Sequence, residues 1–394
     1  MLKGYDIICF SSDWRQDPLS KHHIMSRLAR QNRVLWINSI GMRTPTISRQ
    51  DFTKGYNKLK NYFQNRLEKV NDNLYVLSPL VLPFHGSKPA NYLNKYLLLW
   101  QVKHCQKRLG LNHPILWSFL PNAVSVFGKL GEKLALYYIT DDFTKFTGHP
   151  SESIARMEEE LLDRADLLIS SSRHLAEIKG RGKLIHFIGH GVDHRHFNRA
   201  LGIGPEGWPE DIRGVKRPVI GFYGEINDWL DLEMIRQAAI LKPEWSFALL
   251  GRVAVEAGDL NYLKDVKNIH LLGQKKFDDL PAYCASFDVG LIPMKMNELT
   301  ACVNPLKLRE YLAAGLPVVS APLPEVLPFG DVVKFADSAQ EYILAIENVL
   351  KVPKQRQAAI LSQRVKNESW DSKVVEISAI IEEALEKQCS RTSQ

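Results

Sequence analysis

The sequence lacks the features that mark membrane-spanning, disulfide-stabilised and metal-binding chains. No apolar run approaches the ~20 residues that a membrane-spanning helix needs, and residues 1–10 carry no signal-peptide cleavage region. The five cysteines are scattered, without the spacing of a disulfide framework or a metal site. No low-complexity tract is present. We therefore expect a reduced, cytosolic, globular protein that holds no metal.

The chain alternates between strand and helix patterns, which predicts parallel sheets with helices on both faces. Its 394 residues exceed the ~250–300 at which a single core stops growing, so two domains are expected. Helices are predicted at 19–31, 89–109, 121–130 and 151–164, and a last one near 369–371. Strands are predicted at 6–10, 33–38, 74–78, 114–119, 134–139 and 166–171, and again at 218–223, 245–251, 268–273, 288–293, 317–320 and 332–335.

The stretch 180–218 is dense in Gly, Pro and His with little periodicity, and we interpret it as a hinge. Both halves have the doubly wound pattern, so a ligand is expected at the carboxyl ends of the strands, between the halves.

Positive charge is concentrated in the first half of the chain. Residues 1–200 hold 29 Lys and Arg against 17 Asp and Glu, whereas the remainder holds 22 against 27. Two basic stretches with apolar residues at helical spacing stand out, 43–69 and 92–108. Such helices dock on anionic lipid, but solvated faces of core helices have the same pattern, and both readings stay open. Nucleic acid is the weaker partner, because no nucleic-acid-binding motif accompanies the charge.

The most informative segment is NPLKLREYLAAGLPVVS, residues 304–320. It predicts a helix that Gly315 ends in the left-handed conformation, with Pro317 barring its continuation. The positive end of that helix suits a phosphate. Lys307 adds a cation there, and Glu310 can accept hydrogen bonds from hydroxyls. Together these residues predict a site for a nucleotide sugar.

This segment resembles the donor-site signature of GT-B glycosyltransferases of the group 1 (family 4) type. In that family an E-x7-E pair frames the helix, the second Glu contacting the nucleotide and the first the transferred sugar. The second Glu matches Glu310, but the first position is Cys302. The resemblance therefore implies the nucleotide half of the motif and leaves the sugar half open, with Glu298 and Asn304 near enough to substitute.

The same resemblance implies the fold and further donor contacts. It implies two Rossmann-like domains, at 1–198 (acceptor) and 199–365 (nucleotide sugar), with a C-terminal helix, 366–394, that packs back on the N-terminal domain. The glycine loop GFYGE (221–225) sits where the family binds the diphosphate, although Glu225 follows where a cation is usual; Arg252 could supply that cation or form a structural salt bridge. The residues expected to bind the donor are Gly224, Arg252, Gly273, Gln274, Asn304, Pro305, Leu306, Lys307 and Glu310.

Acid–base chemistry is expected from the strand-end loop LYYITDDFTKF, 136–146. A carboxylate within hydrogen-bond reach of the acceptor hydroxyl can take its proton. We expect Asp141 to do so if transfer inverts, and only to orient the acceptor if it retains. Asp142 is a candidate acceptor contact, or an N-cap for the next element. The predicted catalytic residues are thus Asp141, Lys307 and Glu310.

The segment FIGHGVDHRHF (187–197), taken with Asp141, resembles the xanthan-type glucuronosyltransferases, which invert, whereas family 4 enzymes retain. Its histidines do not share one helix face, which argues against zinc. Loop residues after the first strand, Asp13, Trp14 and His22, are expected to bind the acceptor, with Trp14 stacking on a sugar ring.

The implied function is transfer of a sugar from a UDP or GDP sugar to a saccharide or lipid-linked saccharide, in cell-surface or exopolysaccharide biosynthesis, without a cofactor. Peripheral attachment to the inner face of the plasma membrane would fit the basic stretches. Two alternatives are a catalytically silent GT-B protein that binds nucleotide sugars or acts as a scaffold, favoured by Cys302 and Glu225, and a sugar-nucleotide epimerase.

Overall fold

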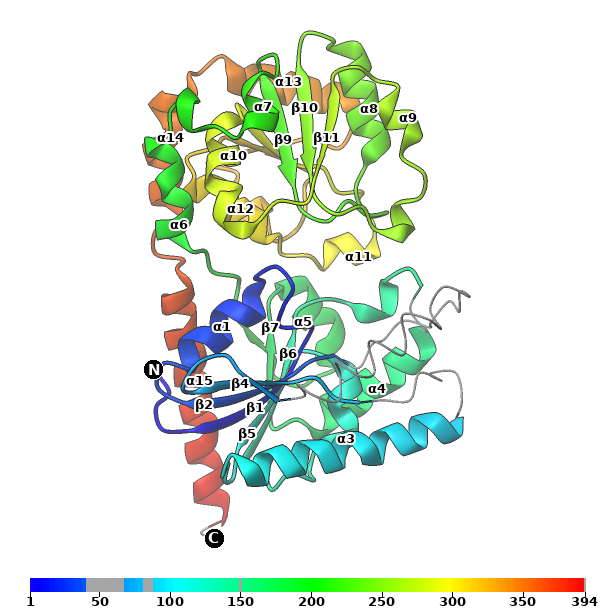
Figure 1. Cartoon of the computed structure of the whole chain (residues 1–394), viewed down its shortest axis with the longest axis vertical. Helices are drawn as coiled ribbons and strands as arrows, with labels where there is room; N and C mark the ends of the chain where they lie inside the picture. Colours follow the sequence, from blue (N-terminus) through cyan, green and yellow to red (C-terminus); the bar gives the residue numbers. More distant parts are fainter. Residues whose placement is uncertain (40–66, 81–87, 149–150, 393–394) are drawn as a thin grey trace. The chain divides into compact units, whose positions relative to one another are not determined.

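The computed structural model describes residues 1–39, 67–80, 88–148 and 151–392. The chain divides into two compact units. Unit 1 comprises Met1–Ser171, Leu175–Ile188 and Val374–Gln394, and unit 2 comprises Ser172–His174 and Gly189–Lys373. Each unit is built on its own sheet (Figure 1).

The described part of unit 1 forms an eight-stranded sheet in the order β3-β4-β2-β1-β5-β6-β7-β8. All neighbouring strands run parallel except β3, which is antiparallel to β4. The central strands are buried along their whole length, as expected for parallel strands covered on both faces. The strands are β1 (Asp6–Phe10), β2 (Arg33–Ile37), β3 (Leu67–Lys69), β4 (Leu74–Leu77), β5 (Ile115–Ser118), β6 (Leu134–Ile139), β7 (Leu167–Ser170) and β8 (His186–Phe187).

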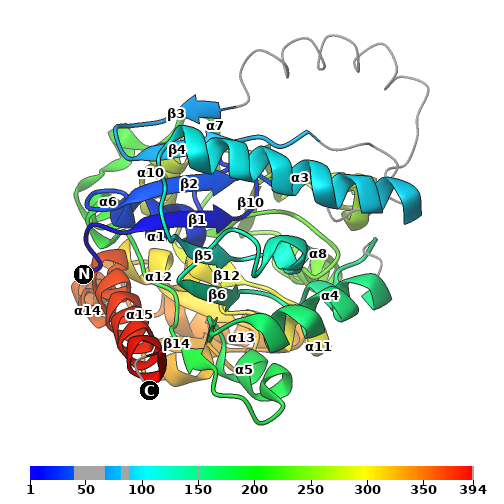
Figure 2. The same ribbon diagram turned by 90° about the horizontal axis from the view of Figure 1, so that it is seen from below.

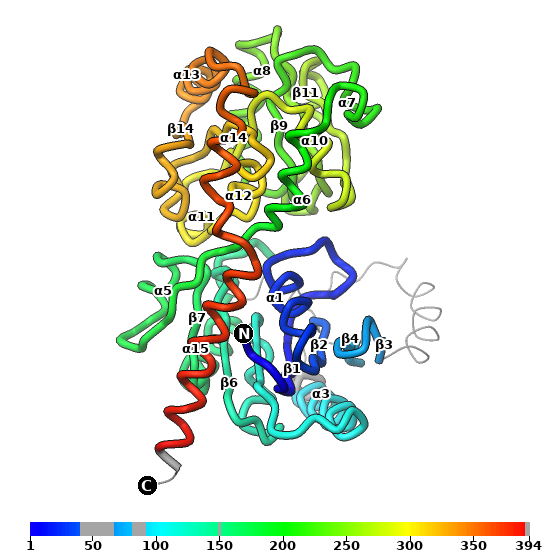
Figure 3. Tube along the Cα trace, turned by 90° about the vertical axis from the view of Figure 1, so that its left-hand side faces the viewer, coloured from blue at the N-terminus to red at the C-terminus, as the bar shows by residue number. Residues whose placement is uncertain are grey.

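Helices cover this sheet, and two of them are long. The helix α3 lies beside β4, where Gln101 bonds the backbone of Leu80 through both ends of its amide (Figure 2). The C-terminal helix α15 belongs to unit 1 from Val374 onward and runs beside β7 (Figure 3), which confirms that it packs on the N-terminal domain. The helices are α1 (Ser20–Leu28), α3 (Lys88–Arg108), α4 (Ser151–Arg164), α5 (Arg173–Gly180) and α15 (Trp370–Thr392), with 3-10 turns η1 (Pro121–Val126) and η2 (Phe143–Lys145).

The sheet of unit 2 has six parallel strands in the order β11-β10-β9-β12-β13-β14. The strands are β9 (Val219–Tyr223), β10 (Ser246–Leu250), β11 (Ile269–Gly273), β12 (Val289–Ile292), β13 (Val318–Ser320) and β14 (Val333–Phe335). The helices are α6 (His194–Asn198), α7 (Glu210–Arg213), α8 (Leu232–Leu241), α9 (Asn261–Lys264), α10 (Leu280–Ser286), α11 (Glu298–Ala301), α12 (Leu306–Ala313), α13 (Ala339–Leu350) and α14 (Lys354–Arg364). The 3-10 turns are η3 (Arg199–Gly202), η4 (Pro205–Gly207), η5 (Val255–Ala257), η6 (Phe277–Asp279) and η7 (Leu327–Phe329).

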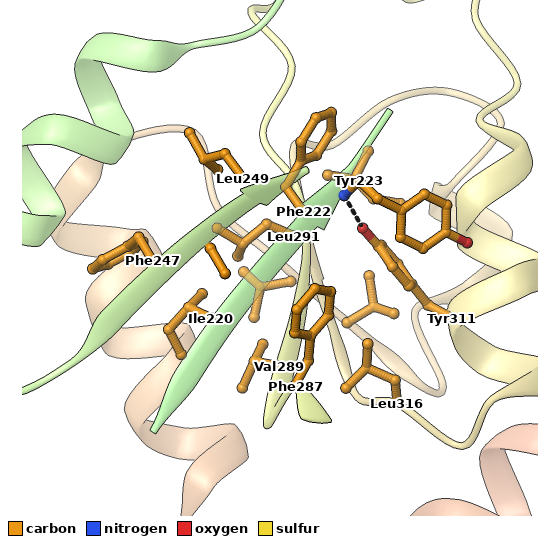
Figure 4. Packing of buried hydrophobic residues seen from close by; sticks show 14 of the residues in the cluster. Ile220, Phe222, Tyr223, Phe247, Leu249, Phe287, Val289, Leu291, Tyr311 and Leu316 are labelled. Atoms are coloured by element: carbon orange, nitrogen blue, oxygen red, sulfur yellow. Dashed lines mark hydrogen bonds between the residues drawn. The ribbon is translucent and has the colours of Figure 1, made fainter. Parts of the chain in front are cut away.

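The core of unit 2 fixes α12 against the central strands. Phe287, Leu316 and Tyr311 of α12 pack against the face of the sheet where β9 and β12 carry glycines (Figure 4): a Cβ on Gly221 would collide with Phe287, and one on Gly290 would lie 2.9 Å from Tyr311. The hydroxyl of Tyr311 also accepts a hydrogen bond from the backbone N–H of Tyr223 at 3.1 Å. Because Tyr311 lies one residue after Glu310, this contact holds the second turn of α12 beside the end of β9.

The end of α12 follows the prediction from 304–320. Gly315 has φ +67, and a Cβ there would lie 2.8 Å from the Cβ of Ala358 in α14. Glycine is thus needed both for the left-handed backbone and for the close approach of α14.

One expectation about the elements was wrong. The helix predicted at 121–130 is only the 3-10 turn η1, because the chain leaves helical conformation at Phe127 and turns at Gly128, which has a positive φ. The stretch 180–218, interpreted as a hinge, holds the boundary between the units at Ile188 and Gly189, and it also contains the short elements β8, α6 and α7. Periodicity could not detect these elements, because they are only two to five residues long.

The first basic stretch, 43–69, lies outside the described residues except for its last three. The second, 92–108, lies in α3. Within the described ranges, each helix is too short or too polar to span a bilayer.

Candidate active site

Lys307 lies in the first turn of α12, beside Gly224, the residue that follows β9. A Cβ built on Gly224 would lie 3.3 Å from the Nζ atom of Lys307, and that atom lies 5.3 Å from the centre of the Phe222 ring. Gly224 has φ +139, a conformation that a side chain would strain. The backbone after β9 and the ammonium group are therefore in close contact.

The Lys307 ammonium is only partly exposed, and burial lowers its pKa, which Glu310 partly offsets. The helix begins at Leu306 after Pro305, and the Leu308 N–H makes its first bond, to the Pro305 carbonyl, so the N–H groups of Leu306 and Lys307 precede the hydrogen-bond ladder at this end. A half-desolvated cation beside a helix N-terminus is an arrangement that an anionic ligand would stabilise.

Glu310 is held by a residue that the sequence analysis did not identify. The hydroxyl of Tyr223, the last residue of β9, donates a 2.7 Å hydrogen bond to Oε2 of Glu310. Burial raises the pKa of Glu310, while the Tyr223 hydrogen bond and Lys307 oppose that rise. The carboxylate is thus fixed in direction and remains a hydrogen-bond acceptor.

Asn304 is buried and bonded to a charged network rather than displayed at the surface. Its Oδ1 accepts a 2.9 Å hydrogen bond from Arg309, which also forms a 2.7 Å ion pair with Glu368. The Arg309 guanidinium lies over the ring of Phe329. This network connects the residue before Pro305 to the segment that precedes α15.

The other predicted donor contacts lie at the ends of β10 and β11. Arg252 forms an ion pair with Glu225, which is the structural salt bridge that the sequence analysis left open. Gly273 ends β11 with φ +69, and Gln274 follows it on the exposed loop. Lys275, the next residue, pairs with Asp211 at 2.6 Å.

Cys302, at the position of the missing family Glu, is buried. Its thiol donates a 3.5 Å hydrogen bond to the backbone carbonyl of Glu298, which is an exposed residue at the start of α11. This position presents no carboxylate, so any carboxylate for the sugar must come from another residue.

The histidines of 187–197 bond separately and do not form a common site. The Nε2 atom of His194 lies 3.1 Å from the Ser362 carbonyl, and that of His196 lies 3.0 Å from the Phe277 carbonyl. His190 is buried near Trp370, and burial lowers its pKa to about 3. The described residues hold no cluster of metal-ligating side chains.

In unit 1, Asp141 follows β6 and interacts electrostatically with Lys21 of α1. Burial raises the pKa of Asp141, while Lys21 and Thr140 lower it. Burial lowers the pKa of Lys21, which Asp141 opposes. A carboxylate with a raised pKa is better suited to accept a proton from a hydroxyl.

Asp142 has structural partners. Its side chain caps η2 by accepting from Thr144, and it forms a 2.9 Å ion pair with Lys179. Lys179 also pairs with the buried Glu158 at 2.7 Å. Asp142 is therefore the N-cap of η2, the second of the two roles considered for it. Asp141, by contrast, interacts with Lys21.

Trp14 and His22 form an aromatic cluster with Trp36. Their ring centres lie 4.9 to 5.2 Å apart. The Nδ1 atom of His22 accepts from the N–H of Leu19, and burial lowers the His22 pKa to about 4, so the ring is neutral. Asp13 is exposed and accepts from the N–H of Arg15.

Comparison with solved structures identifies the fold class of the chain. The chain is similar to sucrose-phosphate synthase from Thermosynechococcus elongatus, with a TM-score of 0.70 at 12% identity over 96% of this chain and 98% of that chain. It is also similar to HepE of Anabaena, solved in complex with UDP and glucose, with a TM-score of 0.65 at 16% identity over 95% and 99% of the two chains. At these identities the likeness establishes the fold, and the fold is GT-B.

Comparison of the sequence with known families finds a match within unit 2. Residues 217–351 match the family described as Glycosyl transferases group 1, so the chain carries that family's domain and the resemblance found in 304–320 is confirmed. The chain is 32% identical over 209 residues to TuaH of Bacillus subtilis (strain 168), whose name assigns it to teichuronic acid biosynthesis as a glycosyltransferase. That match spans about half of each chain. The likeness to xanthan-type glucuronosyltransferases stays a prediction.

Proposed function

We propose that this chain transfers a sugar from a nucleoside-diphosphate sugar, with UDP as the first nucleotide to test, to a saccharide or lipid-linked saccharide of a cell-surface polymer. The observation that carries the proposal is the position of Lys307, in the first turn of α12 against Gly224, the residue that follows β9. The group 1 family match, the name of TuaH and the UDP in the HepE structure support the choice of substrate class.

In this proposal the donor diphosphate lies against Gly224, where no side chain blocks its approach to the backbone. Lys307 and the N–H groups of the first turn of α12 neutralise the charge that develops on the leaving diphosphate. Glu310, oriented by Tyr223, accepts hydrogen bonds from hydroxyl groups of the nucleotide. Arg252 pairs with Glu225, but its side chain is largely exposed. In this proposal its guanidinium leaves Glu225 to bind a phosphate of the donor.

In unit 1, Asp141 is the proposed base if transfer inverts, because its raised pKa favours proton acceptance. If transfer retains, Asp141 orients the acceptor hydroxyl instead. Trp14 and His22 supply a ring face and a neutral imidazole for a saccharide acceptor. The proposal includes peripheral attachment to an anionic membrane, where a lipid-linked acceptor would be held.

One observation favours a second function, nucleotide-sugar binding without turnover. The buried thiol of Cys302 replaces the carboxylate that the family uses for the transferred sugar. A chain of this kind would keep the diphosphate contacts and lose the sugar contact.

A two-stage experiment tests the proposal and separates it from this alternative. First, the melting temperature is measured with UDP, GDP and their hexose conjugates; the proposal requires stabilisation by at least one of them. Second, the stabilising nucleotide sugar is supplied in radiolabelled form with membrane extract as the acceptor. Label in a polymer or lipid fraction supports transfer, whereas binding without labelling supports the silent protein. An unmoved melting temperature with every nucleotide would reject both.

A further inference from the structure

The outer face of α3 carries an aromatic and basic surface that the transfer reaction does not use. We propose that this face is where the protein docks on an anionic lipid bilayer. The inference extends the proposed membrane attachment by assigning its surface, and its test needs no turnover.

The helix has two clearly different sides. Its inner side is a buried stripe at helical spacing, formed by Asn94, Leu98, Gln101, Val102 and Cys105. This stripe anchors the helix on unit 1, where Gln106 also bonds the Leu130 carbonyl at 2.9 Å. The outer side is therefore held in a fixed orientation by the same contacts.

The outer side exposes large side chains that normally avoid water. Tyr92 is 62% exposed, Leu93 56%, Tyr96 51% and Trp100 61%. Tyr92, Tyr96 and Trp100 follow one another at intervals of four, and Leu93 lies beside Tyr92, so all four residues share one face of the helix. Tyr92 and Tyr96 contact each other, with ring centres 4.8 Å apart and hydroxyls 3.0 Å apart, and the Trp100 ring stacks on His104. The result is a contiguous aromatic surface rather than scattered single residues.

The charge on the helix is of one sign. The 21 residues of α3 include five Lys and Arg and no Asp or Glu. Lys103, Lys107 and Arg108 are exposed and continue the outer side toward the C-terminal end. Burial lowers the pKa of Lys129, outside the helix, and the nearby Lys95 lowers it further. The aromatic part of the face is thus followed by a cationic part.

This combination fits a bilayer surface. Tyr and Trp favour the interface between lipid and water, where the ring is partly buried and the polar group stays hydrated. Lysine ammonium groups reach the headgroups while their stems cover apolar surface. Anionic lipid attracts each nearby cation with an energy equal to about a fivefold gain in partitioning. Nucleic acid fits less well, since Tyr92 and Tyr96 pack on each other instead of offering free ring faces to bases.

The test uses the full chain and co-sedimentation with vesicles. The wild type should bind vesicles of phosphatidylcholine with phosphatidylglycerol, bind pure phosphatidylcholine far less, and be released as salt increases. The variant Lys103→Gln/Lys107→Gln should lose about 25-fold in partitioning, from two cations at about fivefold each. The variant Tyr96→Ser/Trp100→Ser should lose about tenfold or more, even at low salt, because the interfacial rings are gone.

Matched controls lie on unit 2. Lys264→Gln/Lys267→Gln removes the same charge from exposed positions, and Tyr262→Ser removes an aromatic ring that is 40% exposed. Both controls should bind vesicles as the wild type does. Every variant should keep the wild-type melting temperature and its nucleotide shift, which separates docking from folding and from donor binding.

Several results would overturn the docking surface. These are a wild type that ignores anionic vesicles, α3 variants that bind as tightly as the controls, or binding that moves to single-stranded nucleic acid. A wild-type dimer that the α3 variants dissociate in analytical ultracentrifugation would instead identify a second copy as the occupant. Absence of a nucleotide shift in the wild type would reject the proposed function and leave the vesicle result intact.

Discussion

The substitution Lys307→Met separates an effect on donor binding from an effect on folding. It should weaken the affinity for UDP but should not lower the melting temperature of the free protein. Methionine keeps the length and apolar stem of the side chain but removes the ammonium group beside Gly224. In the free protein this ammonium is partly buried, and the lowered pKa shows that burial disfavours its charge. Removing the charge should therefore leave the free protein as stable as before, or more stable by a few degrees in melting temperature.

The bound state should respond differently. An ammonium group about 4 Å from a phosphate oxygen gains about 4 kcal/mol at an effective dielectric constant of about 20. Part of that gain is lost because both groups leave water, so we expect a net loss of about 2 to 3 kcal/mol in the variant. This corresponds to a Kd for UDP that rises about 30- to 150-fold.

Isothermal titration with UDP, UMP and uridine measures the effect. The Lys307→Met loss should be largest for UDP, smaller for UMP and negligible for uridine, because the lost contact is to the phosphates. Lys242→Met is the control, since Lys242 is a half-buried lysine that pairs with Glu347 near the amino end of β10. Equal UDP affinity in wild type and Lys307→Met, or an equal loss for uridine, would refute the assigned role.

Three other substitutions test neighbouring parts of the structure. Gly224→Ala should cost about 1 to 3 kcal/mol in unfolding free energy from backbone strain at φ +139, and should weaken UDP binding by pushing on Lys307; unfolding in urea and titration measure the two effects. Tyr223→Phe should weaken UDP binding by about 1 kcal/mol, because Glu310 loses the hydroxyl that orients it; unchanged titration curves would contradict this. His190 has a pKa of about 3 in the folded state against about 6.5 unfolded, so the unfolded chain binds more protons as pH falls through this range. Protonation of His190 in the unfolded chain should therefore remove about 3 kcal/mol of unfolding free energy as the pH falls from 7 to 4. In His190→Phe this loss should be absent, so the urea midpoint should fall less steeply with acid.

The regular elements, α12 among them, could be predicted from sequence because their signals are local. The buried strands of both sheets have apolar runs bounded by turn residues, and α4 was predicted within its observed bounds, 151–164. The end of α12 was predicted from Gly315 and Pro317 alone. In each case the physical cause lies within a few residues of the effect, so a single sequence contains it.

The contacts that tune the candidate site could not be predicted, because they join distant residues. Tyr223 and Glu310 are 87 positions apart, and Arg309 and Glu368 are 59 apart. Nothing near Glu368 in the sequence indicates that it accepts from Arg309 of α12. The same holds for Asp142, whose partner Lys179 lies 37 positions away.

Arg309 shows why this matters for the donor site. Its neighbour Glu310 points toward Tyr223, while Arg309 points the other way, to Asn304 and Glu368, so α12 is held from both sides in its first two turns. A single flexible cation could serve a phosphate on its own, but its position would then vary. Because α12 is fixed by these two sets of contacts, the backbone that carries Lys307 is already in place before a ligand arrives. Preorganisation of this kind reduces the entropy cost of binding. It also makes the loss expected for Lys307→Met a loss of charge rather than of helix geometry.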